Sequence, residues 1–322
     1  MRMPPERSLF ADGRLHLHDG PIDLIIEAFG EPFAVERAYE AAWHRFATIL
    51  DELCAELPLL RSQAKPTGAR PCGVVAARMA DAVAPLCVSR FITPMAAVAG
   101  AVAEEILWAM THAAPLRRAY VNNGGDIALH LLPGESFSIG MVDRPDRPSL
   151  IGSATISEND VIRGVATSGW RGRSFSLGIA DAVTILARSA AQADAAATLV
   201  ANAVDLPAHP AIRRVPAHSR DPQSDLGGRL ITVNVGPLTR SEIQQALASG
   251  SDEAERLGRA GVLEAAALRL CGQTVLCGSV LGKLAAPGGA TVRRARTTRT
   301  GTRRPHAAGR VDAEAKMMGG FR

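Results

Sequence analysis

Two glycines and an aspartate, Gly124-Gly125-Asp126, directly follow a stretch that is typical of a β-strand. Paired glycines permit a positive φ and leave no Cβ atoms where a ligand lies against the backbone. Asp126 adds a hydrogen-bond acceptor beside them. The pattern therefore fits a ligand-binding turn, although spacing alone favours a simpler alternative, a tight turn with a capping aspartate.

A second polar group, Thr167-Ser168-Gly169, lies at the end of a later expected strand. Two hydroxyls and an open backbone amide can bind a phosphate or a carbonyl oxygen. The chain has no G-x-S-x-G sequence and no recognisable order of serine, histidine and acid, so we do not expect Ser168 to be a nucleophile. An ordinary polar turn is again the simpler alternative.

A third group, Asp194 and Thr198, is spaced by four residues, which places both oxygens on one face of a helix. Asn202 extends the same stripe. A carboxylate with a hydroxyl suits a hard cation such as Mg²⁺, which keeps bound waters and shares substrate phosphates. Without further information, a solvated helix face explains this spacing better than a metal site.

These residues must be positioned by strands and helices that the hydrophobic pattern predicts. Thr93-Pro94 is a typical helix start, and Ser189-x-x-Gln192 is a capping box. The turns between successive strands are short, which favours antiparallel pairing. The predicted fold is therefore α+β, an antiparallel sheet with packed helices. The expected strands are 15–17, 22–26, 118–122, 127–132, 136–142, 149–155, 164–167, 181–186, 230–235 and 274–279. The expected helices are 35–60, 74–83, 93–113, 189–204, 241–257 and 261–270, with a polar loop at 213–227.

The net charge of +4 is unevenly distributed. Residues 288–322 contain nine basic side chains and only two acidic ones, so the rest of the chain is net acidic. We therefore predict a single domain over 1–287 and a basic, disordered tail over 288–322. The acidic body and the aromatic content of 4% argue against nucleic-acid binding except through the tail.

The five cysteines show no C-x-x-C spacing, and the first residues contain no apolar signal segment. The longest apolar run, 95–103, is too short to cross a bilayer. These features predict a cytoplasmic protein with reduced thiols and no membrane association. The glycine turn and the polar strand end described above indicate a small-molecule ligand. They leave a homo-oligomer open.

Four segments together resemble the ApbE-like flavin transferase superfamily, the FAD:protein FMN transferases. The strings ITPMAAVAGAVAEE and ATSGWRGRSFSLGIADAVTILARSAAQADAAATL look like one offshoot, the uncharacterised protein family 0280, over most of residues 8–280. The four segments are AVAGAVAEEI (97–106), AYVNNGGDI (119–127), GVATSG (164–169) and ADAAAT (193–198).

The resemblance implies an ApbE-like fold and a role for each matching position. Gly124, Gly125 and Asp126 match a turn that holds FAD, and Thr167, Ser168 and Gly169 match a second strand end that contacts the flavin. Asp194 and Thr198 match Mg²⁺ ligands. A backbone carbonyl that completes the metal site falls at Val98.

Two departures from the family pattern concern the reaction. Ala99 stands where the transferases have a lysine, and the segment that carries their histidine is reduced to 176–181. Asp181 is the remaining candidate acid or base. The resemblance therefore implies a protein that binds a flavin or another phosphate-bearing molecule with Mg²⁺ and acts on it as a transferase or hydrolase. The alternative is a flavin- or nucleotide-binding protein that has lost catalysis.

Overall fold

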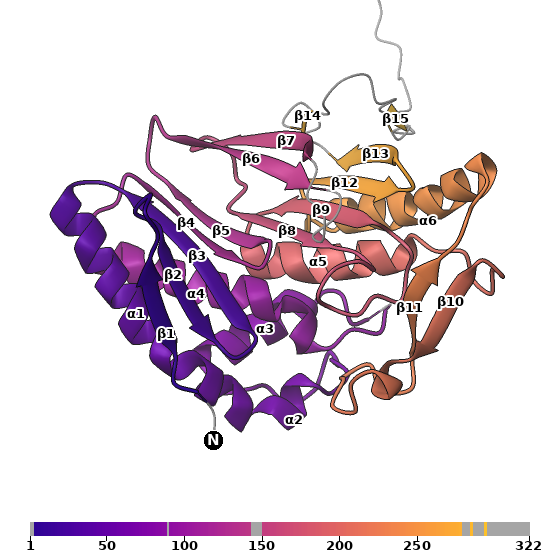
Figure 1. The fold of residues 1–322 in the computed structure, drawn as a ribbon, viewed down its shortest axis with the longest axis horizontal. Helices are drawn as coiled ribbons and strands as arrows, with labels where there is room; N and C mark the ends of the chain where they lie inside the picture. Colours follow the sequence, from indigo (N-terminus) through magenta and orange to yellow (C-terminus); the bar gives the residue numbers. More distant parts are fainter. Residues whose placement is uncertain (1–2, 89, 143–149, 279–283, 286–292, 295–322) are drawn as a thin grey trace, which may run out of the picture.

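The computed structural model describes residues 3–88, 90–142, 150–278, 284–285 and 293–294. Its main feature is a ten-stranded sheet in the order β1-β2-β3-β4-β5-β8-β9-β12-β13-β15 (Figure 1). Every neighbouring pair is antiparallel except β13 and β15. The strands are β1 (Glu6–Leu9), β2 (Leu15–Asp19), β3 (Ile22–Phe29), β4 (Arg118–Asn123), β5 (Asp126–Leu131), β8 (Gly164–Ser168), β9 (Ala182–Ala187), β12 (Ala265–Leu270), β13 (Gln273–Gly278) and β15 (Arg293–Arg294).

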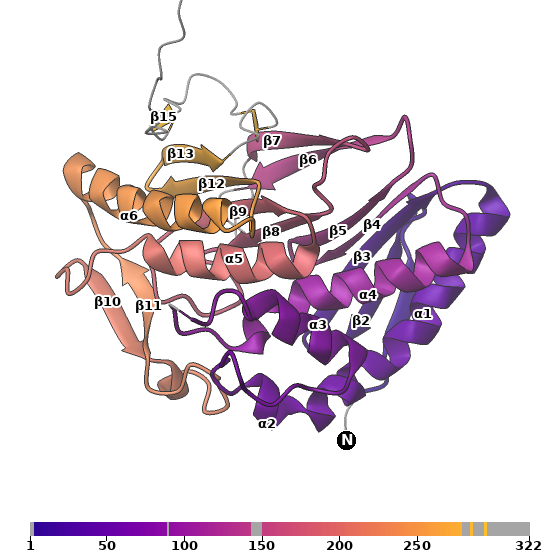
Figure 2. The same cartoon turned by 180° about the vertical axis from the view of Figure 1, so that it is seen from behind.

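A layer of helices covers one face of this sheet (Figure 2). α1 packs on β2 and β3, α4 on β4 and β5, α5 on β8 and β9, and α6 on β12 and β13. One buried apolar cluster runs through this layer from Leu15 to Cys277. The helices are α1 (Pro32–Ala55), α2 (Leu57–Leu60), α3 (Val74–Val83), α4 (Val98–Ala113), α5 (Ala190–Ala203) and α6 (Arg240–Arg259), with two 3₁₀ turns, η1 (Pro94–Ala97) and η2 (Ala217–Ser219).

The other face of the sheet is covered by a small sheet of β14 (Leu284–Ala285), β7 (Leu150–Ser157) and β6 (Ser136–Val142). A second apolar cluster fills this interface, where Met141 and Ile156 meet Leu129 and Leu186. A separate two-stranded ribbon, β10 (Ile212–Pro216) with β11 (Leu230–Val235), projects beside the helical layer (Figure 1). The predicted α+β class with an antiparallel sheet is confirmed.

Several predicted elements differ from the structure. The helix expected over 261–270 is absent, and strand β12 begins within this range at Ala265. Five of its six residues are buried, and a strand buried on both faces has no period-two pattern. The single helix expected over 35–60 is divided at Glu56, just before Pro58. The polar loop expected at 213–227 contains most of β10 and the turn η2, and strand β1 was not predicted.

The two predicted helix caps gave different outcomes. The Ser189 side chain accepts the Gln192 amide at the start of α5, as expected. Thr93 makes no capping hydrogen bond, because its hydroxyl donates to the Asp225 carboxylate far along the chain. Of the predicted tail, the structure describes only Arg293–Arg294, which pair with β13, and the prediction of disorder otherwise lies outside the described residues.

Candidate functional site

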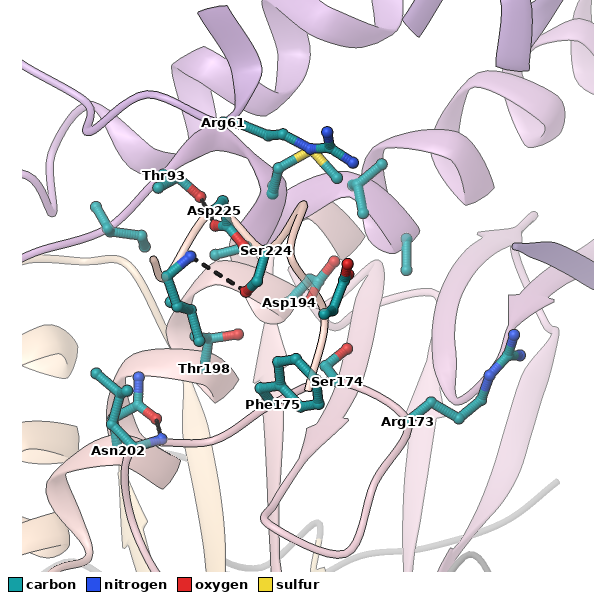
Figure 3. Close-up of a pocket in the computed structure, with 18 of the residues that line it drawn as sticks. Arg61, Thr93, Arg173, Ser174, Phe175, Asp194, Thr198, Asn202, Ser224 and Asp225 are labelled. Atoms are coloured by element: carbon teal, nitrogen blue, oxygen red, sulfur yellow. Dashed lines mark hydrogen bonds between the residues drawn. The ribbon is translucent and has the colours of Figure 1, made fainter. Parts of the chain in front are cut away.

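The site is a cavity of about 340 Å³ between the start of α4, one face of α5 and two connecting segments (Figure 3). One of these segments, 173–177, follows β8, and the other, 221–226, comes from the β10–β11 ribbon. Asp194, Thr198 and Asn202 line the cavity from α5, and Asp126 lines it from the first position of β5. The structure therefore brings the predicted α5 stripe and the aspartate of the glycine turn to one cavity.

Helices α4 and α5 meet at this cavity through their first turns. A Cβ atom on Gly100 would lie 2.2 Å from the carbonyl oxygen of Ala190, so the two backbones are in direct contact. This contact lets the Asp194 carboxylate reach the α4 N-terminus, where Oδ2 accepts the Gly100 amide at 3.0 Å. The Ala99 amide binds the same carboxylate. Asp194 thus caps α4 from a different helix.

Two carboxylates in this cavity hold their protons unusually strongly. Burial raises the pKa of Asp194 to about 7, although the Gly100 and Ala99 amides act in the opposite direction. Burial also raises the pKa of Asp126 well above its ordinary range, and repulsion by the Asp194 charge adds to this. Both side chains are only partly exposed. At neutral pH the pair therefore favours a bound proton or a cation.

The other two members of the α5 stripe play different parts. Thr198 lines the cavity and makes no recorded hydrogen bond through its hydroxyl within the described structure. Asn202 is used structurally, since its Oδ1 accepts the Leu177 amide at 2.9 Å and the Ser176 hydroxyl at 3.2 Å. Asn202 therefore fixes the connecting segment that forms one wall.

The glycine turn positions Asp126 and does not itself line the cavity. Gly124 and Gly125 have φ values of 65° and 116°, and together they close the two-residue turn between β4 and β5. The Asn123 side-chain amide donates to the Ala99 carbonyl at 3.2 Å, which ties this turn to the start of α4. The turn thus holds Asp126 next to the helix junction.

The Thr167-Ser168-Gly169 group also lies beside the cavity and not among its lining residues. The Thr167 backbone amide donates to Asp126, and its hydroxyl lies 3.0 Å from that of Thr184. A Cβ on Gly169 would lie 2.4 Å from the Asp181 carbonyl oxygen, so Gly169 allows a close backbone contact. Ser168 pairs with β9 in the sheet. Of these three residues, Thr167 is the one that binds Asp126.

Asp181, the predicted acid or base, is held by protein groups. Its Oδ1 lies 3.1 Å from Arg171 Nε, and its Oδ2 accepts the Cys271 amide at 2.6 Å. Its side chain is 14% exposed and is not among the cavity-lining residues. The structure therefore leaves no carboxylate oxygen of Asp181 directed at the cavity.

The metal-ligand set expected at this site is only partly assembled. Val98 lines the cavity, but it is the first residue of α4, so its carbonyl is directed along the helix and away from the N-terminus. Asp194 and Thr198 offer a carboxylate and a hydroxyl, and Asp126 offers a second carboxylate. Within the described ranges no group of three His, Cys, Asp or Glu side chains could hold a metal. The donors are all oxygens, which fits a hard, partly hydrated cation such as Mg²⁺.

Several lining residues were not predicted from the sequence. Arg61 follows α2, and Arg173 and Phe175 come from the segment after β8. Asp221 and Asp225 belong to the ribbon segment, which is fixed by the Thr93 bond to Asp225. The arginine- and aromatic-rich string 170–175 was a signal for the segment after β8. Nothing local in the sequence marks Arg61 or the ribbon residues.

A family model described as AbpE bacteria matches residues 7–276. The chain belongs to this family. The match includes both helices of the junction, the glycine turn and the ribbon, so every element of the cavity lies inside the family region.

Relatives of this AbpE-family chain include UPF0280 proteins, to which the predicted family 0280 corresponds. One from Methanopyrus kandleri is 39% identical over 111 residues, covering 34% of this chain and 43% of the relative. One from Methanospirillum hungatei is 34% identical over 140 residues, covering 39% and 51%. One from Archaeoglobus fulgidus is 35% identical over 119 residues, covering 35% and 45%. The chain spans about half the length of these curated relatives.

Among solved structures, the AbpE-family chain is similar to the apo crystal structure of the Pseudomonas stutzeri flavinyl transferase ApbE. The TM-score is 0.39 at 11% identity, over 85% of this chain and 94% of that chain.

In the part of the chain that the structure describes, no helix has both the length and the apolar character needed to span a membrane.

Proposed function

We propose that this cavity binds a phosphate-bearing small molecule together with Mg²⁺, and that a flavin nucleotide such as FAD is the first candidate ligand. The proposal rests mainly on one observation, the two carboxylates Asp126 and Asp194 with raised pKa values in one cavity. Two ionised carboxylates repel each other when they share a site. A divalent cation removes that repulsion and attracts a phosphate.

The available side chains fit such a complex. Asp194 and Thr198 would hold the cation, and the Asp126 carboxylate lines the same cavity. Mg²⁺ keeps several waters and takes its remaining ligands from substrate phosphates, so an incomplete protein ligand set is expected. Arg61 supplies positive charge for the phosphate, and Phe91 and Phe175 supply aromatic surface for a ring. The volume of about 340 Å³ lies at the small end of ligand cavities.

The reaction class that suits these groups is transfer or hydrolysis at phosphorus. In hydrolysis, a water oxygen bonds to phosphorus, the bond to the leaving phosphate oxygen breaks, and the water loses a proton. Asp126 can accept that proton when it is ionised, because the raised pKa of its carboxyl makes it a stronger base than an ordinary carboxylate. When bound, Mg²⁺ would neutralise charge on the phosphate oxygens.

A second candidate function is binding of a flavin or another nucleotide without turnover. Ala99 replaces the lysine that the family resemblance predicts. Asp181 is engaged by Arg171 and by the Cys271 amide, so it is a poor acid or base for a ligand in the cavity. These two observations favour a carrier or sensor over a catalyst.

The test is titration of the purified protein with FAD, with and without Mg²⁺, followed by absorbance and calorimetry. We expect binding that requires Mg²⁺ and that weakens about tenfold or more in Asp194→Asn, which removes the charge and keeps an acceptor for the α4 amides. Asp221→Asn, an exposed carboxylate of the same cavity, is the matched control. Thr198→Val removes the hydroxyl proposed as a cation ligand and provides a second test of Mg²⁺ binding.

The outcomes separate the candidates. Conversion of bound FAD to FMN and AMP would support the catalytic version, and Mg²⁺-dependent binding without products would support the binding version. Metal-independent binding that is equal in Asp194→Asn and the parent protein would contradict the proposed metal site. Absence of FAD binding in the folded protein would exclude FAD as the ligand.

A further inference from the structure

A second cavity, of about 290 Å³, lies at the N-terminus of α5. It is lined by α4 residues from Glu104 to Thr111, whereas the first cavity is lined by Val98 and Ala99 at the start of the same helix. Its other walls come from α3, from β5 and from the residues before β8 and before α5. It therefore belongs to the opposite side of the α4–α5 junction from the first cavity.

Three arginines from three different segments line this second cavity: Arg78, Arg163 and Arg188. Glu104 is the only lining carboxylate recorded among the described residues. One carboxylate oxygen of Glu104 is already hydrogen-bonded, because its Oε1 accepts the Ala191 amide at the start of α5 at 2.8 Å. The cavity therefore has an excess of positive charge.

The partners of the arginines neutralise only part of that positive charge. Arg163 donates to the carbonyl oxygens of Asp160, Ile162 and Glu158 at 2.6, 2.6 and 3.0 Å, which fixes the guanidinium without neutralising it. Arg188 pairs with Glu264 through Nε at 3.0 Å, and its side chain is 61% exposed. A guanidinium has five N–H donors, so one such contact leaves donors for a ligand.

Arg78 is the most neutralised of the three. Its Nη1 lies 2.9 Å from Glu105, and its Nε lies 3.3 Å from Glu104. Arg45 also contacts Glu105 at 2.6 Å, so this part of the wall is a rigid ion-pair network with α1. Arg78 therefore shapes the cavity. Arg163 supplies a charge that its backbone partners do not neutralise, and Arg188 supplies further N–H donors beside its ion pair with Glu264.

Trp108 gives the cavity an aromatic side. It is a lining residue, it is 52% exposed, and its ring lies against that of His112, with centroids 4.1 Å apart and the planes tilted by 33°. An exposed tryptophan beside arginines can bind a flat ring while the guanidiniums bind a phosphate.

We propose that this second cavity binds a phosphate monoester carried on a planar ring, the chemistry of a nucleoside monophosphate. Arg163 and Arg188 bind the phosphate oxygens, and Trp108 contacts the ring. The site is separate from the first cavity, and it does not depend on the function proposed there.

The test uses AMP and inorganic phosphate as probes on the full chain, with binding followed by calorimetry and by tryptophan fluorescence. We expect saturable AMP binding that changes Trp108 fluorescence and is weaker for inorganic phosphate. Arg188→Gln and Arg163→Gln should each weaken AMP about tenfold, the usual loss when one charged hydrogen bond is removed. Arg117→Gln, an exposed arginine elsewhere, is the matched control and should bind AMP like the parent.

Two further variants keep the proposal falsifiable. Trp108→Phe should remove the fluorescence response and weaken AMP more than inorganic phosphate. Asp194→Asn should leave AMP affinity unchanged, because it alters the first cavity only. The proposal is wrong if folded protein shows no saturable AMP binding at millimolar concentration, or if Arg188→Gln binds AMP like the parent. Equal affinity for AMP and inorganic phosphate would overturn the role of Trp108.

Discussion

The two cavities beside the α4–α5 junction have opposite charge. The first is lined by four aspartates and two arginines, and the second by three arginines and one glutamate. A carboxylate from each helix also accepts hydrogen bonds at the N-terminus of the other helix. Asp194 binds the α4 amides, and Glu104 binds the Ala191 amide of α5. The local arrangement is therefore nearly symmetrical, and the surroundings differ.

A helix N-terminus therefore does not by itself set the protonation state of the carboxylate that caps it. The α4 amides favour an ionised Asp194, yet burial raises its pKa to about 7, and its neighbour is another carboxylate. Glu104 instead lies against Arg78. The first cavity is consequently suited to cations and the second to anions, although both use the same two helices.

The largest expected effect is a pH-dependent change in the free energy of unfolding, caused by the acidic first cavity. Between about pH 4 and about pH 7, the Asp194 carboxyl has lost its proton in the unfolded chain but still holds it in the folded chain. The free energy of unfolding therefore falls as the pH rises through this range. A change from 3.8 to about 7 corresponds to about 4 kcal/mol. The unfolding free energy of Asp194→Asn should therefore rise relative to the parent by up to this amount between pH 4 and pH 8.

Denaturant unfolding at several pH values measures this difference directly. Asp221→Asn, at an exposed position of the same cavity, is the control and should show a nearly constant difference from the parent. The three guanidinium groups of the basic cavity do not titrate in this range. A difference between Asp194→Asn and the parent that stays constant with pH would break the comparison between the two cavities.

The next largest effect is a loss of stability at the α4–α5 junction, which separates the two cavities. In Gly100→Ala the new Cβ would lie 2.2 Å from a backbone oxygen of Ala190, and neither backbone can move without shifting its helix. We expect a loss of about 3 kcal/mol in the free energy of unfolding, measured by urea or thermal denaturation. Gly228→Ala has open space around it and is the matched control. Equal stability of the two variants would contradict the close contact of α4 and α5.

The smallest effect concerns the α5 cap beside the basic cavity. The Ser189 hydroxyl accepts the Gln192 amide, so Ser189→Ala should cost about 1 kcal/mol and speed hydrogen exchange at Gln192. The exposed Ser249→Ala on α6 is the control and should be nearly neutral. Unchanged exchange at Gln192 in Ser189→Ala would show that Glu104 alone caps this helix end.

The sequence predicted those features that depend on neighbours along the chain. The glycine turn at 124–125, the Ser189 cap and helix α3 over 74–83 were predicted correctly, because turn geometry and apolar spacing act over a few residues. The prediction failed for β12, whose burial on both faces removes the alternating pattern. It also failed for the Thr93 cap, since the hydroxyl binds Asp225.

For the candidate site, the sequence determined which residues are chemically able to act, and the tertiary structure decided which of them meet. Asp126 and Asp194 reach one cavity because β5 and α5 are joined through the start of α4. Asp181 is turned toward Arg171 and the Cys271 amide. The protonation of Asp126 and Asp194 depends on burial and on their mutual repulsion. The charge of the second cavity depends on arginines from distant segments. Such effects act through space, so the order of residues along the chain does not reveal them.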